Sequence, residues 1–266
     1  MLSPCPMKLK QIEQCKSLDF EPFLNKNAWA LPLAYQDVVF NAKGNQALDL
    51  ELSLEETLFK AFPALSCVDA GRLYHALKNS GIKCDWEKLF TQHQLKWSED
   101  LENLFLVLKG LPNNFLKWAA QKDLGFNELR ILTHGQKNID GTNLLKFLDK
   151  LVTLNPSRQI GAKILEYFVE LEDVSLLQEV LEKNSADHIL QFLTEKRFPR
   201  TTLADNKASK QVQEFPWPSH VKAQWLRQGD RAGVEVKFFS SSSDDLKKKI
   251  SLLNELKDKN IEKLWN

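Results

Sequence analysis

The chain has 266 residues, of which 43% are hydrophobic and 27% charged, and its formal net charge at pH 7 is +1. This composition is typical of a folded protein with one large or two to three small domains, and it excludes collagen-like and wholly disordered chains. No apolar run reaches the roughly 18 residues of a membrane-spanning helix and no basic-then-apolar leader opens the sequence, so we expect a cytoplasmic protein without membrane contact.

Residues 1–50 are interrupted by prolines at positions 4, 6, 22 and 32. The apolar pieces between the prolines are too short to establish a helical or strand period. We therefore expect an irregular N-terminal segment with a short strand, held on the rest of the protein by its aromatic side chains.

Residues 51–195 predict a helical domain. Ser53 and Glu56 have the spacing of a capping box, which opens a helix that Pro63 ends. A second helix is predicted from about Val68 to Asn79, and apolar residues at helical spacing then continue through residue 193.

Residues 82–112 within this domain predict a helix-turn-helix. A short helix from Asp85 to Phe90 is followed by a tight turn and by a second helix that Ser98 caps. In DNA-binding proteins with this layout the second helix enters the major groove. Here its first turn carries carboxylates at positions 99, 100 and 102, which suit the helix dipole but oppose phosphate.

No catalytic, metal or cofactor motif is recognisable. The four cysteines lack Cys-x-x-Cys spacing, the five histidines are isolated, and Gly-rich phosphate loops are absent. Six acids in residues 166–182 have no histidine at metal-ligand spacing, and we interpret them as a solvated helix face. We expect no enzymatic activity, no metal and no cofactor.

Residues 196–219 are polar and contain two prolines around Trp217, which is typical of a linker between domains. Their basic residues allow a second interpretation, in which Lys196, Arg197 and Arg200 form an arm that contacts phosphates.

Residues 220–266 predict a ββα unit. Two alternating stretches around the turn at 228–231 form a hairpin with one apolar face, and Ser243 is expected to cap a final helix. About 45 residues of this kind cannot bury enough apolar surface alone, so we predict a homodimer, with docking on the helical body as the alternative. The expected dimer contacts are Trp225, Val234, Val236, Phe238, Leu246, Ile250, Leu253 and Leu256.

From Val68 onward the order of these parts resembles the ParB family of chromosome and plasmid partition proteins. The resemblance rests on Asp69-Ala70 with Leu73-Tyr74, on Trp86-Glu87-Lys88-Leu89, on Ser98 with Asn103-Leu104, on Leu111-Pro112, and on the hairpin unit with Gly233-Val234-Glu235-Val236. It implies a mainly helical fold, duplex DNA and a second copy of the chain as partners, a partition-system protein as a further partner, and a nucleoid-associated location.

The chain departs from the family pattern in two places. Residues 1–67 contain no Gly-Glu-Arg-Arg nucleotide-binding box, so CTP binding is not expected. Acids also replace the Ser-Arg-Ser that family members usually carry in the recognition helix.

Two functions remain open from the sequence. In the first, the protein binds duplex DNA as a homodimer through the helix-turn-helix. Its expected DNA contacts are Lys83, Lys88, Lys96, Trp97, Ser98, Asn103, Lys196, Arg197 and Arg200. In the second, the protein is a ParB-derived dimeric scaffold that no longer reads DNA.

Overall fold

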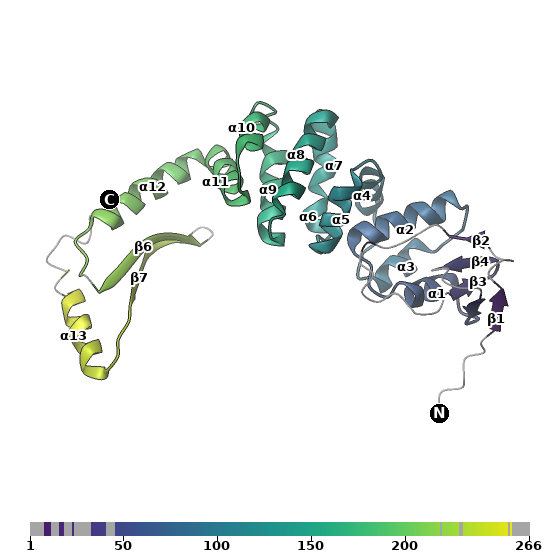
Figure 1. The fold of residues 1–266 in the computed structure, drawn as a ribbon, viewed down its shortest axis with the longest axis horizontal. Helices are drawn as coiled ribbons and strands as arrows, with labels where there is room; N and C mark the ends of the chain where they lie inside the picture. Colours follow the sequence, from purple (N-terminus) through teal and green to yellow (C-terminus); the bar gives the residue numbers. More distant parts are fainter. Residues whose placement is uncertain are drawn as a thin grey trace. The chain divides into compact units, whose positions relative to one another are not determined.

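The computed structural model describes residues 8–11, 16–18, 23, 33–40, 46–218, 220–228, 231–254 and 256. The chain forms two compact units, Met1–Leu193 and Thr194–Asn266 (Figure 1). The predicted mainly helical fold with a small two-stranded sheet near the C-terminus is confirmed. Among the described residues, none of the helices has the length and apolar character needed to span a bilayer.

The N-terminal segment contains more regular structure than the sequence predicted. Its strands are β1 (Lys8–Gln11), β2 (Lys16–Ser17), β3 (Leu33–Tyr35), β4 (Val38–Phe40) and β5 (Gln46–Asp49), joined in the order β1-β5-β3-β4-β2. Each strand has two to four residues. The antiparallel pairs are β1 with β5 and β3 with β4, and the parallel pairs are β2 with β4 and β3 with β5. Such short strands carry no readable alternation, so their pairing depends on the tertiary fold.

The helical body occupies most of the N-terminal unit. Its helices are α1 (Leu54–Ala61), α2 (Cys67–Asn79), α3 (Trp86–Gln92), α4 (Glu99–Lys109), α5 (Asn113–Gln121), α6 (Phe126–Leu129), α7 (Ile131–Asn138), α8 (Gly141–Leu154), α9 (Arg158–Leu171) and α10 (Leu176–Glu182). Helix α11 (Ala186–Arg197) crosses the boundary between the units. The Ser53 half of the predicted capping box is confirmed, since its Oγ accepts a hydrogen bond from the Glu56 backbone N–H at 3.3 Å, whereas the Glu56 carboxylate lies 3.6 Å from Lys88 Nζ.

Close helix contacts hold this body together. Gly71 of α2 lies against Phe105 of α4, where a Cβ would come within 2.9 Å of the ring. Phe147 of α8 stacks on Phe168 of α9 with 3.8 Å between ring centroids. The buried side chains form one apolar core that extends from Leu18 and the strand residues to Leu193 of α11.

The C-terminal unit contains α12 (Pro199–Glu214), β6 (Val221–Gln228), β7 (Arg231–Phe238) and α13 (Ser243–Asn254). The predicted hairpin is confirmed, with Trp225 opposite Val234 in an antiparallel pair.

Helix α12 corrects the interpretation of residues 196–219 as a linker. The helix begins with Pro199 at its first position and contains no glycine. Most of its residues are polar, and only Ala208 and Val212 are buried along it. Its sequence therefore resembles that of a hydrated linker. The helix is stable because it packs on β6, a partner that local composition does not reveal.

Replacing Gly161 with alanine tests a close helix contact of the body. The new Cβ would lie 2.8 Å from Trp118 Cη2 and Cζ2 and 3.2 Å from Pro156 Cγ. Because the indole is confined in the core, we expect Gly161→Ala to lower the free energy of unfolding by about 1–3 kcal/mol, measured by urea denaturation.

Gly141→Ala is the matched control, because no atom lies within 4 Å of its Cβ position. This variant should be neutral or more stable by less than about 1 kcal/mol. Equal stability of the two variants would contradict the close packing of α5 on α9.

Candidate nucleic-acid interface

Helices α3 and α4 lie where the sequence predicted the two helices of the motif. Asp85 caps α3, and Ser98 caps α4 through a 3.2 Å hydrogen bond from the Leu101 backbone N–H to its Oγ. The apolar residues of α4 that the sequence assigned to the core are buried, including Leu104 and Phe105.

An aromatic cluster fixes the connection between the two helices. The Trp97 ring stacks on Phe90 with 5.5 Å between centroids and an interplanar angle of 15°. It also lies 6.1 Å from Trp86 and 5.7 Å from Tyr74. A base contact by Trp97 or Ser98, both expected DNA contacts, would therefore require the loss of packing or of the helix cap.

Glu102, one of the three acids at the start of α4, is bound at the surface by two side chains of α2. Its Oε1 accepts hydrogen bonds from the Tyr74 hydroxyl and, at 3.2 Å, from Lys78 Nζ. The Tyr74 hydrogen bond and then the Lys78 hydrogen bond lower the pKa of the Glu102 carboxyl below its ordinary value. Lys78 neutralises this carboxylate, whereas Glu99 and Asp100 remain exposed.

The other expected DNA contacts of the N-terminal unit fall into two groups. Lys83, Lys96 and Asn103 are exposed to solvent. Lys88 lies 3.2 Å from Ser53 Oγ and 3.6 Å from Glu56 Oε1, which ties it to the start of α1.

The exposed face of α4 forms one wall of a groove of about 1120 Å³. The opposite walls come from α6, α7 and α9, and Leu106 in the groove is 51% exposed. The charged lining residues are Asp100, Glu128, Arg130, Lys137, Glu166 and Glu170, with His134 beside them. The sequence did not predict this groove, because helices from residues 99–171 form it only after they pack.

The described histidines, cysteines and acids are the candidates for metal ligands. Within the described parts of the chain, no group of three or more His, Cys, Asp or Glu side chains is placed to hold an ion. Burial raises the pKa of the Cys67 and Cys84 thiols to about 12, so both remain protonated at neutral pH.

In the C-terminal unit, one carboxylate joins α12 to the hairpin. Asp205 accepts hydrogen bonds from Trp225 Nε1 at 2.8 Å and from Arg227 Nε and Nη2 at 2.6 and 2.8 Å. The paired Arg227 bonds have the two-pronged geometry that makes such contacts strong. Trp225, an expected dimer contact, is thus engaged within its own chain.

The remaining expected dimer contacts differ in exposure. Val236, Leu246 and Ile250 are exposed, whereas Leu256 is buried. Phe239, which the sequence analysis missed, is 81% exposed immediately after β7. The sequence feature that could have indicated it is the pair Phe238-Phe239, in which a second apolar residue interrupts the alternation of apolar and polar residues in β7.

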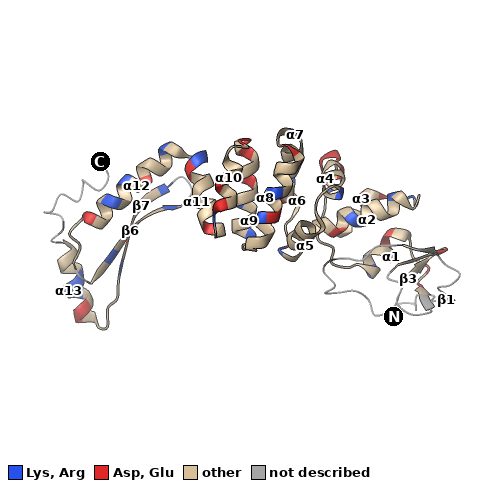
Figure 2. Ribbon diagram, turned by 45° about the horizontal axis from the view of Figure 1, so that its top comes forward, with Lys and Arg blue, Asp and Glu red and all other residues tan. Residues whose placement is uncertain are grey.

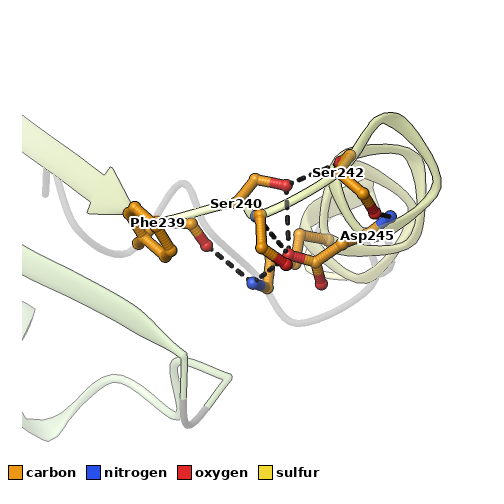
Figure 3. Close-up of polar contacts among 6 residues, drawn as sticks. Phe239, Ser240, Ser242 and Asp245 are labelled. Carbon is orange, nitrogen blue, oxygen red and sulfur yellow. Dashed lines mark hydrogen bonds and ion pairs between the residues drawn. The ribbon is translucent and has the colours of Figure 1, made fainter.

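The start of α13 is held by a serine and aspartate cluster (Figure 3). Ser242, rather than the predicted Ser243, caps the helix, since its Oγ accepts from the Asp245 backbone N–H at 3.1 Å. Four consecutive serines made this position ambiguous in the sequence. Lys249 donates to Asp245 Oδ2 at 2.7 Å and to the Phe239 carbonyl at 2.6 Å, which ties α13 to the end of β7. The Lys249 hydrogen bond and then the Ser241 backbone N–H lower the pKa of Asp245 to about 2.

Tyr74→Phe tests the neutralisation of Glu102. A carboxyl whose pKa is lower in the folded than in the unfolded state stabilises the fold above its unfolded pKa and loses this effect as pH falls through the folded pKa. Without the Tyr74 hydroxyl, we expect the Glu102 pKa to rise toward 4.5 and the acid-induced loss of stability to begin at higher pH. Carboxyl carbon NMR titration measures the first change and urea denaturation across pH 3–6 the second.

Tyr167→Phe, which removes a hydroxyl from α9, should leave the Glu102 titration as in the wild type. An unchanged Glu102 pKa in Tyr74→Phe would contradict the assigned hydrogen bond.

Comparisons of the chain with protein-family models, with curated proteins and with solved structures find no match. The resemblance to the ParB family therefore stays an expectation from the sequence, and the function is inferred from the residues and charges described above.

Proposed function

We propose that this protein binds duplex DNA as a homodimer, in a role related to chromosome or plasmid partition or to nucleoid organisation. The observation that carries the proposal is the distribution of charge between the two units. Thr194–Asn266 contains 15 Lys and Arg against 10 Asp and Glu, a formal charge of +5, whereas Met1–Leu193 contains 21 against 25, a charge of −4. A near-neutral total thus conceals a basic unit suited to phosphate.

The proposed contacts divide between the two units. Arg200, with Lys196 and Arg197 at the end of α11, supplies phosphate contacts from the basic unit. Lys96 and Asn103 flank the start of α4 and remain the candidates for base contacts, since asparagine pairs with adenine and lysine with guanine. The binding of Glu102 to Lys78 reduces the acidic charge that DNA would meet there.

A protein-interaction scaffold is the second candidate function. Exposed Leu106 and four carboxylates in the groove beside α4 favour a protein partner over a phosphate backbone on that face. In this alternative, the dimer carries two such grooves and does not read DNA.

Fluorescence anisotropy with random-sequence duplex separates the two functions. We expect binding that weakens steeply as salt rises from 50 to 200 mM, because phosphate contacts release counterions. Asn103→Ala should leave this salt dependence unchanged, since asparagine carries no charge, but should reduce any preference among duplex sequences. Absence of binding at 50 mM salt would reject the DNA proposal and leave the scaffold.

The homodimer is supported by the small core of the C-terminal unit. Within the described residues from Thr194 onward, the buried apolar side chains are Ala208, Val212, Val221 and Leu256. So small a core provides little stability, while the exposed side chains of β7 and α13 offer further apolar surface.

Ile250→Asp tests this dimer surface. Ile250 is 45% exposed on α13, and a charge there would be buried without a partner in a dimer. We expect light scattering to report a dimer for the wild-type chain and a monomer for the variant. Leu145→Asp, at a residue 42% exposed on α8, should remain dimeric. A monomeric wild type, or a dimeric Ile250→Asp, would contradict the proposed surface.

A further inference from the structure

Helix α12 carries three basic side chains on one face. Arg200, Lys207 and Lys210 are all exposed. At 3.6 residues per turn, these positions fall within an arc of about 80° around the helix axis. Leu203, 71% exposed, lies inside the same arc. We call this face the α12 stripe.

The opposite face of α12 is turned toward the hairpin. Asp205, Ala208 and Val212 lie about 150° from the middle of the α12 stripe by the same helical geometry. Ala208 and Val212 are buried, and Asp205 is bound by Arg227 of β6. The Arg227 hydrogen bond is the main cause of the lowered pKa of Asp205, so this acid stays ionised and paired.

Because Asp205 is bound by Arg227 on the opposite face of the helix, its charge does not offset the positive charge of the α12 stripe. Asp205 and Glu214 are the acids of α12, and Glu214 lies in its last turn. Up to Lys210 the exposed charged side chains of α12 are Arg200, Lys207 and Lys210, and Glu214 follows about one turn later in the same arc. Figure 2 shows the Lys and Arg positions in blue along α12.

The length of the stripe allows contact with several phosphates. Arg200 and Lys210 are separated by about 15 Å along the helix, at a rise of 1.5 Å per residue. One DNA strand places a phosphate about every 3.4 Å along the duplex axis, so a surface of this length can reach several phosphates. Flexible lysines and an apolar Leu203 favour contacts with phosphate and sugar over a defined reading of base edges.

We propose that the α12 stripe is a sequence-independent phosphate-binding surface for duplex DNA, formed because the hairpin takes up the acidic side of the helix. This inference rests on the proposed DNA binding and assigns it a second surface, separate from Lys96 and Asn103 of the N-terminal unit. Its occupant is the backbone of duplex DNA rather than a particular base sequence.

The test uses the full-length protein and anisotropy titrations with two unrelated duplexes between 50 and 200 mM salt. Each lost phosphate contact reduces the slope of log K against log salt by about 0.9. In the triple variant Arg200→Gln, Lys207→Gln and Lys210→Gln, the magnitude of the slope of log K against log salt should therefore fall by about 2.7, equally on both duplexes. Conversely, Glu214→Lys should steepen the slope by about 0.9, because it adds a cation in the same arc.

The matched control removes three exposed lysines of the N-terminal unit through Lys117→Gln, Lys146→Gln and Lys163→Gln. It lowers the net charge by the same amount and should leave the slope near the wild-type value. Because all substituted side chains are exposed, circular dichroism should show unchanged helix content in both triple variants.

The outcomes separate this inference from the proposed function. A wild-type slope in the stripe variant, or an equal loss in stripe and control variants, overturns the α12 stripe while DNA binding stands. No binding by the wild type at 50 mM salt overturns both.

Discussion

The packing of α2 against α4 is the contact on which the candidate interface depends. Gly71 allows Phe105 to approach the α2 backbone, and Tyr74 and Lys78 on the same helix bind Glu102 at the start of α4. The same Tyr74 ring belongs to the aromatic cluster that includes Trp97. One face of α2 therefore positions α4, fixes the connection that leads to it and neutralises one of its acids.

This arrangement changes the chemistry that α4 offers. Ser98 and Trp97 serve the fold, while Asn103, Leu106 and Asp100 face a groove shared with α7 and α9. Such a surface combines an amide suited to base contact with an apolar patch and acids suited to a protein partner. The side chains on this face of α4 are therefore not sufficient by themselves to indicate DNA binding.

The C-terminal unit contributes the positive charge that the first unit lacks. Asp205 binds Arg227 and Trp225 and so attaches α12 to β6. The attachment covers part of the hairpin with a helix of the same chain, and it directs Arg200, Lys207 and Lys210 to solvent. A single carboxylate thus links the stability of the unit to the charge of its surface.

The sequence by itself determined the elements whose signals are local. Serine caps placed the starts of α1 and α4 because a hydroxyl three residues before a free backbone N–H satisfies it without any tertiary contact. The alternation of Val234 and Val236 located the hairpin for a similar reason, since side chains of a strand alternate between two faces.

Only the tertiary structure decided the features that join distant residues. The pairing of β1 with β5, the binding of Glu102 by α2 and the groove beside α4 all depend on contacts across more than 20 residues. Helix α12 was hidden for the same reason. Its polar sequence is helical because Ala208, Val212 and Asp205 have β6 to pack and bond against, and that partner follows it in the chain. The local sequence pattern indicates which face of a helix or strand a residue lies on, whereas the tertiary fold determines which residue it contacts.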